Sequence, residues 1–104
     1  MRTEGGSPVL IRAFRLAFVV EGLKPPIGYN YTRNAERLAT YFQDRLPKSI
    51  SAYDIRTYVA TLQERFAPET VHEVQFASRR FFRYLVREGE TRRDLTSDMK
   101  LMRY

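Results

Sequence analysis

The chain has 104 residues, of which 43% are hydrophobic and 29% charged, and this balance indicates one globular domain and excludes a disordered chain. It has no Cys and a single His, which excludes a disulfide framework, a thiolate zinc site and a cysteine nucleophile. The formal net charge of +6 favours an acidic partner such as DNA, RNA or anionic lipid, although an uninvolved basic surface has the same composition.

Arginine carries most of the positive charge, because lysine occurs only at positions 24, 48 and 100. The planar guanidinium suits phosphate and guanine better than an ammonium does, which favours nucleic acid. No apolar run reaches the roughly 20 residues of a membrane span, and the first eight residues lack the apolar core of a signal peptide. We therefore expect a cytoplasmic protein that has no membrane partner.

The first helix is expected to follow a Gly-rich, flexible N-terminus, residues 1–8. Ser7 and Pro8 are typical of an N-cap and of the first helical position. Apolar residues then recur at helical spacing from Leu10 to Phe18, and Gly22 predicts the end of the helix.

The second helix is expected after a break at residues 24–28, where two prolines and a glycine occur. It is predicted to end near Leu46 and Pro47. Its apolar stripe consists of Tyr31, Ala35, Leu38 and Phe42. Its opposite face carries Asn30, Arg33 and Arg37.

The third helix is predicted to begin at a capping box formed by Ser51 and Asp54, and to extend to about Arg65. The apolar stripe of this helix is Ile55, Val59 and Leu62, with Tyr58 beside it.

The fourth helix is predicted to begin with Pro68 at its first position and Glu69 in its first turn, and to end at Gly89. Its buried stripe consists of Val71, Val74, Ser78, Phe81 and Leu85, widened by Phe82. We interpret the two phenylalanines as core residues and not as base-stacking groups.

The fold class is therefore expected to be all-α, a compact four-helix orthogonal bundle over residues 9–89. Residues 90–104 have weak periodicity and are expected to form a linker or a short helical turn.

Three motifs, in this order, resemble the N-terminal core-binding domain of tyrosine recombinases, the SAM-like domain of phage integrases. They are Tyr31-Thr-Arg-Asn-Ala-Glu-Arg-Leu, Ile50-Ser-Ala-Tyr-Asp-Ile-Arg-Thr-Tyr-Val, and Thr70-Val through Phe81-Phe-Arg-Tyr-Leu-Val-Arg-Glu-Gly. The resemblance covers residues 11–101, nearly the whole chain. It implies one half of a clamp around double-stranded DNA, the second and fourth helices of which face the major groove and its phosphates.

Carried over residue by residue, the resemblance implies contacts with DNA on two helices. The candidate DNA-binding residues are Asn30, Arg33, Arg37, Thr70, His72, Gln75, Arg79, Arg80 and Arg83. Arg87 is assigned instead to the dipole of the fourth helix. Two positions depart from the family: Glu73 stands where a basic residue is common, and residues 26–28 offer no hydroxyl. We therefore expect weak, mostly non-specific and salt-dependent binding.

The catalytic half of a recombinase is not expected in this chain. His72 is followed by Glu73-Val74-Gln75, which lacks the His-x-x-Arg pattern of the family, and Tyr104 is interpreted as a linker residue. The chain is thus expected to cleave nothing by itself, to need no cofactor or metal, and to take no small-molecule substrate. The resemblance implies two partners, which are DNA and other recombinase protomers in a synaptic complex.

Two alternative functions stay open. A protein-interaction bundle would have an exposed apolar patch and scattered arginines. A helix-turn-helix regulator would use residues 65–67 as its turn and would form a stable dimer on a palindromic site. An enzyme has little support, because the sequence has no paired acids, no Gly-rich phosphate loop and no nucleophile–base pair.

Overall fold

The computed structural model describes residues 7–43 and 45–103, so the expected flexibility of residues 1–6 and the assignment of Tyr104 lie outside the described residues. The described part is all-helical. It contains α1 (Ser7–Glu21), α2 (Pro25–Tyr41), the short 3-10 helix η1 (Pro47–Ser49), α3 (Ala52–Arg65) and α4 (Pro68–Arg87), and no strand. The radius of gyration is 13.2 Å, as expected for a compact chain of this length. In this part of the chain, no helix combines the length and the apolarity that a membrane span requires.

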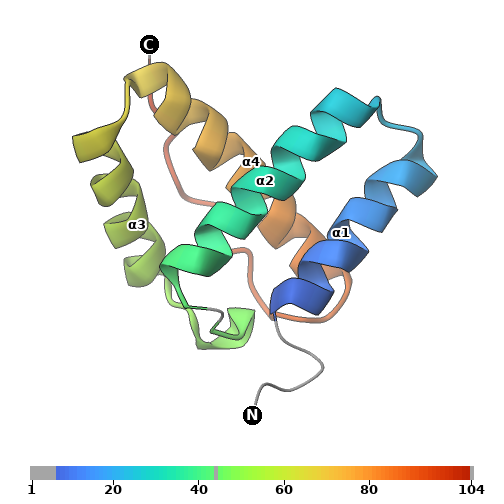
Figure 1. Cartoon of the computed structure of the whole chain (residues 1–104). Coiled ribbons are helices and arrows are strands. Elements are labelled where there is room, and N and C mark those ends of the chain that lie inside the picture. The colour runs from blue at the N-terminus through green and yellow to red at the C-terminus, as the bar shows by residue number, and fades with distance from the viewer. Residues whose placement is uncertain (1–6, 44, 104) are drawn as a thin grey trace.

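Helix α4 is the element on which the others assemble. Figure 1 shows α2 lying across α4, with α1 beside α2 and α3 on the opposite side. The buried face of α4 is the predicted stripe, since Val71, Val74, Phe82 and Leu85 are almost fully inaccessible. The interpretation of Phe81 and Phe82 as core residues is therefore confirmed.

Two helices end as predicted, at glycines. Gly22 and Gly89 have φ values of 80° and 78°, a conformation that side chains with a Cβ disfavour. After Gly22, the N–H of Leu23 donates to the carbonyl of Phe18 at 3.1 Å, and after Gly89 the N–H of Glu90 donates to that of Leu85 at 2.8 Å. Both helices thus end in Schellman motifs, which satisfy carbonyls of the last turn.

The predicted break at residues 24–28 is wrong, because α2 begins there. Pro25 occupies the first turn, where no N–H is needed for a helical hydrogen bond. Gly28 is buried within the helix, and a Cβ at this position would lie 3.4 Å from the Cβ of Phe18. The glycine therefore lets α1 and α2 approach closely and is not a helix breaker here.

The predicted end of α2 near Leu46 is also wrong, because the helix ends at Tyr41. Gln43 adopts a φ of 53°, and its N–H donates to the carbonyl of Thr40 at 3.1 Å. Gln43 adopts the left-handed conformation that glycine usually adopts after the end of a helix. Because no glycine is present here, the sequence does not indicate that α2 ends.

The capping box of α3 is confirmed. The N–H of Asp54 donates to the Ser51 hydroxyl at 3.1 Å, and the N–H of Ser51 donates to the Asp54 carboxylate at 2.9 Å. Ile55 and Leu62 of the predicted stripe are buried, but Tyr58 and not Val59 is the buried residue between them. Tyr58 is buried against Tyr41 and Phe42, whereas Val59 is only half-buried. Burial raises the pKa of Tyr58 to about 12.

We expect Phe82→Ala to destabilise the fold by roughly 3–5 kcal/mol, because it opens a cavity in the core where α4 packs against the other helices. Phe76→Ala on the same helix is the matched control, since Phe76 is 43% exposed and its replacement should cost under about 1 kcal/mol. Urea denaturation of both variants measures the difference. Equal losses would contradict this position of the core.

The capping box should make stability depend on pH. The N–H of Ser51 holds the pKa of Asp54 below its usual value of 3.8, with a further contribution from Arg45. A pKa lowered on folding contributes stability that is complete above pH 3.8 and is lost as the pH falls through the folded-state pKa. Wild type should therefore exceed Asp54→Asn in unfolding free energy at pH 7, and the difference should shrink at pH 3. A difference that is the same at both pH values would argue against this role of the carboxylate.

Candidate nucleic-acid interface

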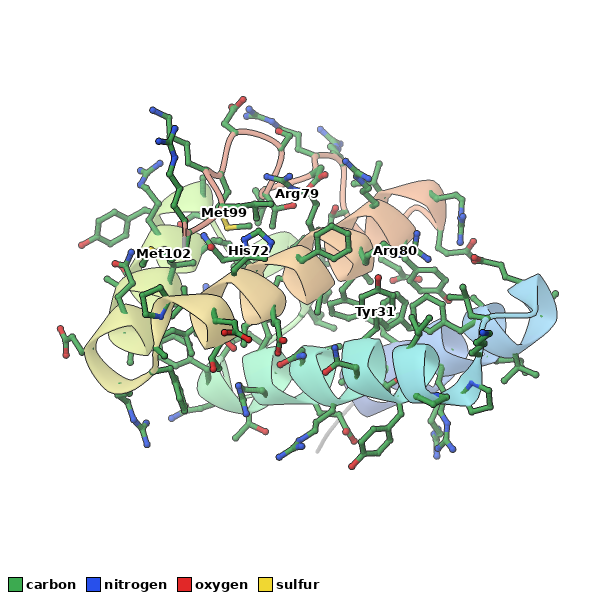
Figure 2. The ribbon with its side chains drawn as sticks, turned by 90° about the horizontal axis from the view of Figure 1, so that it is seen from above. Tyr31, His72, Arg79, Arg80, Met99 and Met102 are labelled. Carbon is green, nitrogen blue, oxygen red and sulfur yellow. The ribbon has the colours of Figure 1, made fainter. Side chains whose placement is uncertain are left out.

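The C-terminal tail, residues 90–103, lies along α4 and binds three of the residues predicted to contact DNA. His72, Gln75 and Arg79 lie on one face of α4, one turn apart, and all three bond to main-chain atoms of the tail (Figure 2). The tail runs antiparallel to the helix, since Arg79 contacts its middle and His72 its end.

Gln75 forms the centre of this contact. Its Nε2 donates to the carbonyl of Lys100 at 2.9 Å, and its Oε1 accepts from the N–H of Met102 at 2.6 Å. The Nδ1 of His72 lies 2.9 Å from the carbonyl of Met102. Gln75 is only 3% exposed, so its amide does not face solvent in this structure.

Arg79 holds the middle of the tail. Its Nη2 donates to the carbonyl of Met99 and lies 3.5 Å from that of Thr96. Its Nε is buried and has no hydrogen-bond partner among the described residues. Thr96 is fully buried, and its N–H and hydroxyl both donate to Asp94. The expected linker is thus a packed, irregular segment over residues 90–103.

Arg80 lies on a different face of α4, toward α1 and α2. Its guanidinium carbon is 5.3 Å from the centre of the Tyr31 ring and 5.5 Å from that of Phe18. Its Nη2 lies 3.7 Å from a carboxylate oxygen of Glu21. Figure 2 shows Arg80 directed from α4 toward Tyr31. Arg80 is therefore held between three helices while its side chain stays 36% exposed.

The predicted polar face of α2 lies at the surface. Asn30 and Arg33 are exposed, whereas Arg37 is half-buried, with its guanidinium carbon 5.3 Å from the centre of the Phe66 ring. Asn34, which the stripe did not predict as buried, is 6% exposed, and its Nδ2 donates to the carbonyl of Asn30 at 3.0 Å. The same amide donates to the Asn30 side-chain oxygen at 3.2 Å, which orients Asn30 at the surface.

The exposed strip of α4 has its charges separated along the helix. Glu69 and Glu73 lie in the first half, and Arg80, Arg83 and Arg87 in the second. Thr70 is half-buried near the acidic end. The arrangement complements the helix dipole. It also concentrates positive charge where α4 meets Tyr31, near the beginning of α2.

Helix α1 exposes a set of apolar side chains. Leu16, Val19 and Val20 are 61%, 68% and 79% exposed, while Phe14 and Phe18 are buried. The helix thus both caps the core and leaves an apolar strip at the surface.

No model of a protein family matches the sequence, and no curated protein or solved structure matches the chain. The resemblance to tyrosine recombinases remains a prediction from the motifs quoted above.

Replacing Gln75 with Leu should release the end of the tail. The Lys100 carbonyl and the Met102 N–H would lose their partner, at a cost of roughly 1–3 kcal/mol. Hydrogen exchange at the Met102 amide should become faster. Glu64→Leu, at an exposed site on α3 that does not face the tail, is the control and should leave this amide unchanged. Unaltered exchange in Gln75→Leu would contradict the contact.

Proposed function

We propose that this chain binds double-stranded DNA as the core-binding half of a tyrosine-recombinase clamp. The four observed helices, their order and their loops support this proposal, because each of the three family motifs falls on a separate helix, α2, α3 or α4. The finer assignment of the bundle as a SAM-like domain belongs to the same proposal.

One observation carries the proposal: exposed arginines lie on both α2 and α4, two helices that pack against each other. Arg80 of α4 packs on Tyr31 of α2, while Asn30 and Arg33 are exposed on the side of α2 that is turned away from Tyr31. Arg83 continues the exposed basic strip on α4. Guanidinium groups from two helices can meet phosphates on both sides of a groove, while Asn30 can read a base edge.

We assign the nine candidate residues to two groups. Asn30, Arg33, Arg80 and Arg83 form the proposed contact surface, with Arg37 and Thr70 at its margin. His72, Gln75 and Arg79 could reach DNA only after the tail had left α4, because their polar atoms bond to it. The smaller set is consistent with weak binding dominated by phosphate contacts.

We expect the chain to bind a labelled DNA duplex more weakly as salt rises, with a log–log slope set by the number of phosphate contacts. The double variant Arg33→Ala/Arg83→Ala should bind about tenfold more weakly at low salt, and its slope should be smaller by about 2. Fluorescence anisotropy at several salt concentrations measures both quantities.

The double variant Arg12→Ala/Arg15→Ala is the matched control, since it removes the same charge from the exposed face of α1. It should weaken binding much less. An equal loss in both variants would show a non-specific effect of net charge and overturn the proposed surface. No binding at low salt would overturn DNA binding altogether.

A second candidate function is a protein contact through α1, which the exposed Leu16, Val19 and Val20 favour. It would be compatible with DNA binding, because the contact surface on α2 and α4 does not include these residues.

A further inference from the structure

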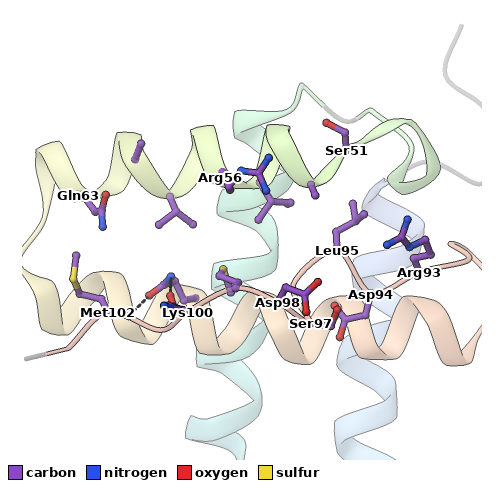
Figure 3. Close-up of a pocket in the computed structure, with 16 residues that line it drawn as sticks. Ser51, Arg56, Gln63, Arg93, Asp94, Leu95, Ser97, Asp98, Lys100 and Met102 are labelled. Atoms are coloured by element: carbon purple, nitrogen blue, oxygen red, sulfur yellow. Dashed lines mark hydrogen bonds between the residues drawn. The ribbon is translucent and has the colours of Figure 1, made fainter.

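A groove separates α3 from the tail, and the DNA-binding proposal leaves it without a role. It encloses about 690 Å³, a size typical of small-molecule sites. One wall is a face of α3 that includes Ile55, Val59 and Ala60, and the other is formed by tail residues that include Leu95 and Met102. Figure 3 shows Leu95 and Met102 directed from the tail toward α3, and Gln63 directed from α3 toward Met102.

The tail wall is held in place by side chains of α4. Gln75 bonds to residues 100 and 102, and Arg79 bonds to residue 99. Leu95, Met99 and Met102 also pack against the hydrophobic core. The groove is therefore a formed feature of the fold, with methionines that adapt to the shape of an occupant.

The groove is elongated. Its lining extends along α3 from Ser51 to Gln63, about 18 Å at the rise of an α-helix. An extended chain can lie along this length.

The bonding of the tail disfavours an extended peptide. The carbonyls of Met99, Lys100 and Met102 accept hydrogen bonds from α4, and the N–H of Met102 donates to it. The main chain of α3 is occupied by its own helical bonds. A peptide in the groove would bury its N–H and C=O groups without partners, whereas an alkyl chain has no such groups.

The charged residues in the lining favour an anionic head. Arg56, Arg93 and Lys100 line the groove together with two carboxylates, Asp94 and Asp98. Asp94 already accepts two hydrogen bonds from Thr96. The lining thus has a net positive charge, and a guanidinium can pair with a carboxylate or a sulfate.

We propose that the groove between α3 and the tail binds a small anionic amphiphile. Its alkyl chain lies between Val59 and Met99, and its head group pairs with Arg56. This inference does not depend on DNA binding and concerns a ligand, not a substrate that is turned over.

The test is a titration of the full ¹⁵N-labelled chain with monomeric sodium decanoate, followed by NMR. Amide signals of Val59, Ala60 and Met99 should shift saturably. Decyltrimethylammonium, with the same chain and the opposite charge, should bind at least tenfold more weakly. Equal binding of both, or shifts confined to the exposed Leu16, Val19 and Val20, would overturn the proposal.

Two variants of α3 locate the site. Ala60→Trp fills the groove and should weaken decanoate binding at least tenfold, whereas Thr57→Trp, exposed on α3 but outside the groove, should leave it unchanged. Arg56→Gln changes only an exposed side chain and should weaken decanoate binding several-fold. This variant tests the site even if Ala60→Trp fails to fold. Unchanged binding in Arg56→Gln would overturn the role of the head group.

A titration with lipid vesicles distinguishes binding of a free amphiphile from binding to a membrane surface. Phosphatidylglycerol vesicles should not shift the groove signals, because the lining is recessed between two walls. Groove shifts with vesicles and none with decanoate would overturn the proposal in favour of a lipid surface.

Discussion

The packing of α4 against the other three helices is the constraint on which the rest of this structure depends. Val71, Phe82 and Leu85 are almost fully buried, and this burial leaves α4 with two further faces. One face holds the tail through His72, Gln75 and Arg79. The other exposes arginines, of which Arg80 contacts α1 and α2. Three faces of a single helix thus have three different roles: one packs in the core, one binds the tail, and one forms part of the proposed DNA surface.

The division of α4 into faces changes how its basic residues are understood. Arg79 and Arg80 are neighbours in the chain, yet a step of one residue turns the side chain by about 100° on a helix. Arg79 bonds to carbonyls of the tail, whereas Arg80 lies over aromatic rings of α1 and α2. A run of basic residues on a buried helix therefore does not form one surface, and each residue must be placed by its own contacts.

The tail connects the two proposals, because it covers part of α4 and also forms a wall of the groove beside α3. Its stability comes from hydrogen bonds to main-chain atoms and from a few apolar contacts. Bonds of this kind depend little on the side chains of the tail itself, which explains why its sequence has no recognisable period. A segment held in this way has fewer buried contacts than a helix and belongs to the less stable parts of a fold.

Local patterns in the sequence were sufficient to predict four helices, the capping box at Ser51 and Asp54, the ends at Gly22 and Gly89, and the buried stripe of α4. Each depends on interactions within a few residues or on one helical period. The sequence did not predict the end of α2 at Tyr41, the helical position of Gly28 against Phe18, or the burial of Tyr58. It could not show that Gln75 binds residues 100 and 102, because that contact joins segments 25 or more residues apart and uses main-chain atoms that every residue has. The positions of the polar residues were therefore decided by the tertiary structure, while the helices that carry them were determined locally.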